Sequence, residues 1–160
     1  MTTNRPHTQT VRINGARVRL TTSASGKVTA KHAAPLEWEL QAAQVRALRA
    51  LPEYGKLFLL AGDQNSAKRG PRAQQQAIAA GMTAGEPDVR IYGSGGRLLL
   101  IENKVGNGKL SPAQASRHTA LAKLGHHVVV LRATTAEAAA QQAVDLVRGW
   151  LASHSSEKAA

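Results

Sequence analysis

Three residues able to do acid–base or metal chemistry, Asp88, Glu102 and Lys104, stand at the ends of a predicted β-hairpin. Two apolar runs flank the segment Gly93–Gly96, whose glycines can adopt the positive φ angles of a tight reversal. A reversal centred on Gly95 places Glu102 directly opposite Asp88, with Cβ atoms about 4.5–5.5 Å apart. The hairpin therefore brings two carboxylates together.

Two carboxylates at that spacing repel each other by about 3 kcal/mol at an effective dielectric constant near 20. Lys104 shares a strand face with Glu102 and offsets one of the charges. The remaining charge suits a hard divalent cation such as Mg²⁺ or Mn²⁺, which activates a bound water and polarises a phosphodiester. A glutamate and a lysine two residues apart on a strand can equally form a surface ion pair. The hairpin alone leaves both interpretations open.

Composition points to a nucleic-acid partner. The chain has 160 residues, enough for one ordinary domain with a real core, and it carries 21 Lys and Arg against 10 Asp and Glu, a net charge of +11. Only 3% of residues are aromatic, which disfavours recognition by base stacking. The sequence has no cysteine, no apolar run of membrane-spanning length and no signal-peptide core. We expect a cytoplasmic protein that acts without a membrane or a small-molecule cofactor.

The first 34 residues carry only positive charges. The stretch Thr10–Leu20 alternates around Asn14-Gly15, a strong hairpin signal, and places Arg17 and Arg19 on one face. A basic hairpin that contacts DNA phosphates and a solvated, partly disordered arm are both compatible with this pattern.

The rest of the chain predicts an α/β domain. In order, the pattern predicts a helix at 35–51, a strand at 56–61, a helix at 73–80, the hairpin at 88–104, a helix opened by Ser111, a strand at 127–132, a helix at 136–151 and a loose tail after 152. Strand 98–104 has leucines on both faces, as a central strand does. Two polar loops supply further candidates for DNA backbone contact, Lys68, Arg69, Arg72 and Lys109.

Two of the predicted helices carry polar residues that could reach the hairpin. Glu37 and Gln41 are neighbours on the first helix, although an acid in a first turn is usually a partner of the helix dipole. Gln114 belongs to a Ser-x-x-Gln capping box, and His118 follows it on the same face. A histidine at such a position is more often a surface residue than a ligand.

Taken together and in order, these motifs resemble the VRR-NUC branch of the PD-(D/E)XK nuclease superfamily. The resemblance runs from about Glu37 to Leu151, and four motifs carry it: Glu37-x-x-x-Gln41, the segment 81–88 ending in Glu-Pro-Asp, Glu102-Asn-Lys104, and the segment 110–114 ending in Gln. It implies a restriction-endonuclease-like core at 35–152, with a mixed central sheet flanked by helices. The basic segment 1–34 and the tail 153–160 fall outside it.

The resemblance also implies site roles. Asp88 and Glu102 become metal carboxylates, with Glu37 and the main-chain carbonyl of Asn103 as further ligands of one or two Mg²⁺ or Mn²⁺ ions. Lys104 becomes the catalytic lysine and Gln114 a residue that orders the site. Glu39 is the alternative to Glu37, because the phase of the first helix is uncertain by one residue.

The function these expectations give is metal-dependent hydrolysis of DNA, either branched, such as Holliday junctions, or double-stranded. The resemblance to compact phage and bacterial resolvases implies a homodimer, and the alanine-rich stretches 113–122 and 136–143 would allow close helix approach. The alternatives are a sequence-preferring nicking or restriction-like nuclease and a non-catalytic architectural DNA-binding protein.

Overall fold

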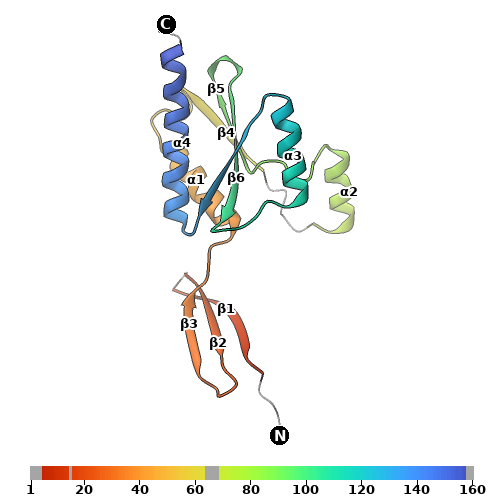
Figure 1. Cartoon of the computed structure of the whole chain (residues 1–160), viewed down its shortest axis with the longest axis vertical. Coiled ribbons are helices and arrows are strands. Elements are labelled where there is room, and N and C mark those ends of the chain that lie inside the picture. Colours follow the sequence, from red (N-terminus) through yellow and green to blue (C-terminus); the bar gives the residue numbers. More distant parts are fainter. Residues whose placement is uncertain (1–4, 15, 64–68, 158–160) are drawn as a thin grey trace. The chain divides into compact units, whose positions relative to one another are not determined.

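The computed structural model describes residues 5–14, 16–63 and 69–157, in two compact units formed by residues 1–35 and 36–160 (Figure 1). Each unit is considered by itself. Lys68, one of the expected DNA contacts, lies outside the described residues. Within the described part of the chain, no helix has both the length and the apolar character needed to span a bilayer.

The first unit is a three-stranded antiparallel sheet rather than a hairpin. It consists of β1 (His7–Ile13), β2 (Ala16–Thr22) and β3 (Val28–His32), in that order. β1 and β2 pair as the Asn14-Gly15 signal predicts, with Ile13 opposite Ala16, and Asn14 has a φ of 49°. β3 was not predicted, because its sequence, Val-Thr-Ala-Lys-His, has no apolar run.

The second unit contains a four-stranded sheet of order β4-β5-β6-β7, in which only the β6–β7 pair is parallel. The mixed α/β architecture agrees with the expected fold class. In chain order its elements are α1 (Glu37–Arg49), β4 (Phe58–Gly62), α2 (Pro71–Ala79), β5 (Val89–Gly93), the 3₁₀ turn η1 (Ser94–Gly96), β6 (Leu98–Val105), α3 (Pro112–Lys123), β7 (Val128–Ala133) and α4 (Ala136–Glu157).

The predicted hairpin register is confirmed. Val89 pairs with Ile101, so the next pair outward is Asp88 and Glu102. Gly95 and Gly96 have φ angles of 67° and 73° and close the turn. β6 is the central strand between β5 and β7. Its residues from Leu99 to Lys104 are all buried, as leucines on both faces predict.

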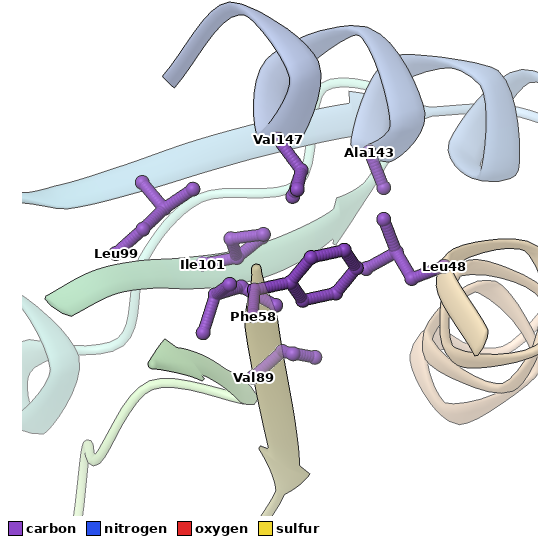
Figure 2. Packing of buried hydrophobic residues seen from close by; sticks show 8 residues of the cluster. Leu48, Phe58, Val89, Leu99, Ile101, Ala143 and Val147 are labelled. Carbon is purple, nitrogen blue, oxygen red and sulfur yellow. The ribbon is translucent and has the colours of Figure 1, made fainter. Parts of the chain in front are cut away.

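The two faces of the sheet are covered by different helices. On one face, Leu99 and Ile101 of β6 pack with Phe58 of β4, Leu48 of α1 and Val147 of α4 (Figure 2). Side chains alternate along a strand, so Leu100, Glu102 and Lys104 point to the opposite face. Figure 1 shows α3 on that opposite side of the sheet from α1 and α4. The apolar core thus fixes which face the charged residues of β6 must take.

Several boundaries differ from the sequence pattern. Glu37, not Pro35, is the first residue of α1, because Leu36 is still extended and its N–H donates to Glu39 Oε2 at 2.8 Å. Helix α4 continues past Leu151 to Glu157, so residues 153–157 are helical rather than loose. Ala139 and Ala143 of α4 are buried within the unit. Their small side chains allow α1 and α4 to pack closely, so these two alanines serve the fold.

Candidate active site

Asp88 sits at the mouth of the hairpin, one residue before β5 begins. Its Oδ2 accepts a hydrogen bond from the N–H of Asn103 at 2.7 Å. The N–H and C=O of one residue in an antiparallel strand face the same neighbour. The Asn103 carbonyl therefore faces the side on which Asp88 lies, where β5 no longer pairs with β6. An oxygen-rich edge forms there, as the expected ligand role of Asn103 requires.

Glu102 is the centre of the site. Its side chain is 0% exposed, and its Oε1 accepts hydrogen bonds from Lys104 Nζ at 2.9 Å and from Gln114 Nε2. Its Oε2 lies 3.6 Å from His118 Nε2, too far for a hydrogen bond. Neither of those two atoms has a hydrogen-bond partner among the described residues. A fully buried carboxylate oxygen without a donor is the most unusual polar atom of the site.

Lys104 joins β6 to α1. The Lys104 side chain is 4% exposed. Its ammonium donates to Glu102 Oε1 at 2.9 Å and to Glu37 Oε1 at 3.0 Å. The pattern predicted that Lys104 would offset one carboxylate, and in the structure it contacts two. Glu37 is therefore the acid of α1 that reaches the site, while Glu39 accepts from the N–H of Leu36. These contacts place Glu37 rather than Glu39 beside the carboxylate cluster, and which of the two would bind a metal stays a prediction.

Two glutamines of α1 hold residues of the site in place, one through the main chain and one through a side chain. Gln41 Nε2 donates to the carbonyls of Asp63 at 3.1 Å and Asp88 at 2.9 Å, and so ties the ends of β4 and β5 together. Gln44 Nε2 donates to Asn103 Oδ1 at 2.7 Å. Gln41 was part of the sequence motif, whereas Gln44 was not singled out. Its spacing of four residues from both Leu40 and Leu48, which are buried, was the signal that could have found it.

The Gln114 side chain makes two hydrogen bonds at the start of α3. Its Oε1 accepts from the N–H of Ser111 at 2.9 Å, which completes the predicted capping box, while its Nε2 reaches Glu102. Gly85, with a φ of 82°, lies so close that an added Cβ would be 2.4 Å from the Ala113 carbonyl oxygen. The loop before Asp88 therefore packs directly on the first turn of α3 and fixes the position of Gln114.

A network that sequence analysis missed braces this loop. Glu86 contacts Arg117 of α3 at 2.7 Å and Arg90 of β5 at 3.2 Å, and Arg90 also contacts Asp63 at 2.9 Å. These side chains come from segments 31 and 27 residues apart in the chain. No local pattern could pair them. They hold the turn before Asp88 against both the sheet and α3.

The site carries excess negative charge. Three carboxylates, of Glu37, Asp88 and Glu102, face one ammonium, so the formal charge is 1 − 3 = −2. Burial, and then the Glu102 charge, raise the pKa of Asp88 from 3.8 to about 6. Burial also raises the pKa of Glu102. Hydrogen bonds to Glu102 and Glu37 raise the pKa of Lys104 in spite of its burial, so this lysine is charged at neutral pH.

This electrostatic strain predicts a pH-dependent stability. Between pH 4 and 6 the folded protein holds a proton on Asp88 that the unfolded chain has lost, so the free energy of unfolding falls as the pH rises. For a shift of about two pKa units the loss is at most about 3 kcal/mol. We expect Asp88→Asn, which keeps the acceptor for Asn103, to be more stable than the wild type at pH 7 in EDTA and no more stable at pH 4.

Urea denaturation of both proteins across this pH range measures the difference. The Glu39→Gln variant is the control for loss of one carboxylate outside the cluster. A wild-type protein that matches Asp88→Asn at every pH would show that Asp88 is not strained in the folded state.

The donor set fits a hard divalent cation, although it is not a preformed cage. Among the described residues, no three His, Asp or Glu side chains form a group ready to hold a metal ion. The available ligands are the Asp88 carboxylate, the unpartnered Glu102 Oε2 and the Asn103 carbonyl. All are oxygens, the charge is −2, and Mg²⁺ characteristically takes one or two carboxylates and keeps several waters. The residues present therefore suit Mg²⁺ or Mn²⁺.

The other expected DNA contacts lie on different elements. Lys109 is exposed in the loop after β6, and this loop packs on Lys104, since a Cβ on Gly108 would lie 3.6 Å from Lys104 Cδ. Arg72 is exposed in the first turn of α2, and Arg69 is half-buried just before that helix. Arg17 and Arg19 belong to the first unit. Among the described candidates, Lys109 is thus the one whose loop packs on a residue of the site.

Comparisons with known proteins find a similar solved structure but no matching family. No family model matches the chain, and no curated protein matches it. Among solved structures, a VRR_NUC domain protein is similar, with 24% identity, a TM-score of 0.47, and coverage of 69% of this chain and 88% of that chain. A TM-score of this size does not establish a shared fold or activity. We therefore derive the function from the geometry of the site.

Proposed function

We propose that this protein is a metal-dependent DNA endonuclease that hydrolyses phosphodiester bonds at the Asp88–Glu102–Lys104 site. The observation that carries the proposal is the buried Glu102, opposed by Asp88 across the hairpin and bonded to Lys104 and Gln114. An architectural DNA-binding protein gains nothing from buried carboxylates that oppose each other and repel phosphate. A metal-dependent hydrolase needs such carboxylates, because their excess negative charge attracts a divalent cation.

In the proposed reaction Asp88, Glu102 and the Asn103 carbonyl hold one or two Mg²⁺ or Mn²⁺ ions. The ion, when bound, would supply Lewis-acid polarisation of the phosphoryl group and a water of lowered pKa. Lys104 is a fixed cation rather than a general base, because its two carboxylate partners keep it protonated. Its ammonium would stabilise the negative charge that develops on the phosphoryl oxygens.

The remaining polar residues position these groups. Gln114 donates to Glu102 and so holds that carboxylate in one rotamer. Gln41 fixes the main chain at Asp88. Glu37 is half exposed, at 49%, and holds Lys104 from the solvent side. In this arrangement Glu37 acts on the ammonium, and its proposed additional role as a metal ligand would require it to exchange Lys104 for the ion.

We further propose branched DNA as the substrate and a two-fold dimer as the active form. Paired cuts across a four-way junction need two sites related by the symmetry of the junction. One surface supports a dimer: Leu59 of β4 and Tyr92 of β5 are paired neighbours, 56% and 45% exposed, on the sheet face that also carries Glu102. Exposed alanines on α3, such as Ala115, would allow a second copy to approach closely.

Two measurements test this finer proposal. Cleavage of matched linear, flap and four-way substrates in Mg²⁺ should be fastest on the four-way junction, with two symmetric nicks. Light scattering should give twice the 16.9 kDa monomer mass, and Leu59→Glu should give the monomer and single, uncoordinated nicks. A wild-type monomer, alone and on junction DNA, would favour the nicking alternative and leave the metal site untouched.

A further inference from the structure

The three-stranded sheet of the first unit has two chemically different faces. The strand registers align side chains across the sheet, so that one set of residues shares a face. This set, called here the cationic face, consists of Thr8, Thr10, Arg12, Arg17, Arg19, Thr21, Thr29 and Lys31. The other face carries the aliphatic residues Val11, Val18, Leu20, Val28 and Ala30. All cations of the strands thus project to one side.

The cations are not merely on one face but are placed opposite one another. Arg12 is paired with Arg17, and Arg19 with Lys31. Like charges directly opposite each other destabilise a sheet. Residues 1–35 contain no Asp or Glu to separate them. In addition, no described residue of this unit is buried, so the sheet has little apolar burial to offset the repulsion. An external anion would relieve it.

The chemistry of the face selects the kind of anion. Neighbouring strands are about 4.8 Å apart, and alternate residues of one strand about 6.8 Å. The four cations therefore form a patch spread over three strands, which suits a polymer of phosphates better than a single ion. The threonines between them add hydroxyl donors that phosphate oxygens accept. The unit has no Phe, Tyr or Trp on which bases could stack.

We propose that the cationic face is a sequence-independent binding surface for the phosphate backbone of double-stranded DNA, separate from the catalytic site. The choice of DNA among phosphate polymers rests on the proposed function. The charge pattern of the face is observed independently of that proposal. Arg17 also donates to the Ala34 carbonyl at 2.7 Å, at the end of the unit, and so contributes to structure as well as to charge. Arg12, Arg19 and Lys31, one from each strand, are the cations with which the binding role is tested.

The test compares two full-length triple variants of equal charge. The face variant is Arg12→Gln, Arg19→Gln and Lys31→Gln. The control variant is Arg49→Gln, Lys56→Gln and Lys123→Gln, all exposed: Arg49 and Lys123 end α1 and α3, and Lys56 lies in the turn before β4. Binding to a linear DNA duplex is measured by fluorescence anisotropy in EDTA from 50 to 300 mM NaCl, a range chosen to follow counterion release. EDTA removes catalysis from the readout.

The face variant should reduce the slope of log K against log salt by about 2.7, since each lost phosphate contact removes about 0.9. The control variant should keep the wild-type slope. Equal slopes for the two variants would overturn the proposal. So would tighter binding of the wild type to phosphatidylserine vesicles than to DNA at the same salt concentration, which would identify a membrane surface instead.

A second measurement guards against misfolding of the face variant. Hydrogen exchange of the wild-type protein should show that DNA slows exchange of the amides of β1, β2 and β3, because ligand binding stabilises the bound unit. Unchanged exchange in these strands at saturating DNA would overturn the proposal without any mutation. Absence of cleavage activity, with these binding results intact, would instead count against the proposed function alone.

Discussion

Replacement of Glu102 by Gln is expected to abolish DNA cleavage and to leave DNA binding intact. Gln keeps the size of the side chain and an acceptor for Lys104 and Gln114, but removes the charge of the fully buried carboxylate. A site that loses this charge loses its hold on the cation. We expect cleavage to fall by at least about 10³-fold, which corresponds to about 4 kcal/mol of lost transition-state stabilisation.

The controls for Glu102→Gln separate chemistry from binding. The Glu39→Gln variant removes one negative charge from the same protein at a residue that caps α1, and it should cleave at the wild-type rate. The Asp88→Asn variant should behave like Glu102→Gln. DNA affinity of both site variants, measured in Ca²⁺ or EDTA, should equal or exceed that of the wild type, because a charge that repels phosphate has been removed. Cleavage by Glu102→Gln at a rate near that of the wild type would exclude Glu102 from the mechanism.

Lys104→Met should have the second largest effect, with a different signature. Met keeps the length of the side chain but removes the cation that joins Glu102 to Glu37. Loss of a fixed cation aimed at the developing phosphoryl charge should slow turnover by about 10²–10³-fold, or about 2.7–4 kcal/mol. Metal affinity should be retained or increased, because the formal charge of the site changes from −2 to −3.

Calorimetric titration with Mn²⁺ distinguishes this outcome from a structural one. Without metal, Lys104→Met should be less stable than the wild type, since a buried carboxylate loses its partner, and Mn²⁺ should restore much of the difference. Loss of Mn²⁺ binding together with activity would make Lys104 a structural partner of the carboxylates rather than a group that acts on the phosphate.

The hairpin shows what a local pattern can predict. Its centre at Gly95 and the alternation of β6 were sufficient to oppose Asp88 to Glu102 and to place Lys104 beside Glu102. The capping box likewise located the start of α3 and hence Gln114. In each case the residues that determine the feature lie close to it in the chain. The regular backbone geometry of hairpins and helix ends then determines where the side chains lie.

Features that depend on contacts between distant segments were beyond sequence analysis. The Glu86–Arg117 and Asp63–Arg90 ion pairs and the Gln44–Asn103 hydrogen bond join segments far apart in the chain. β3 was missed because its pairing with β2, not its own pattern, makes it a strand. The positions of Glu37 and Glu39 depend on where the first turn of α1 lies, and α1 begins two residues later than the sequence pattern predicts.

The most direct test of the central claim is cleavage of labelled four-way and linear DNA by the wild-type protein as Mg²⁺ is titrated from zero to 10 mM in steps, with excess EDTA added to a parallel series. The geometry around Glu102 predicts no products at zero Mg²⁺, a rate that rises and saturates as Mg²⁺ is added, and a return to zero in EDTA. Products that form at the same rate with Mg²⁺ and with EDTA, or no cleavage of any DNA at saturating Mg²⁺ or Mn²⁺, would contradict the claim that Asp88, Glu102 and Lys104 form a metal-dependent nuclease site.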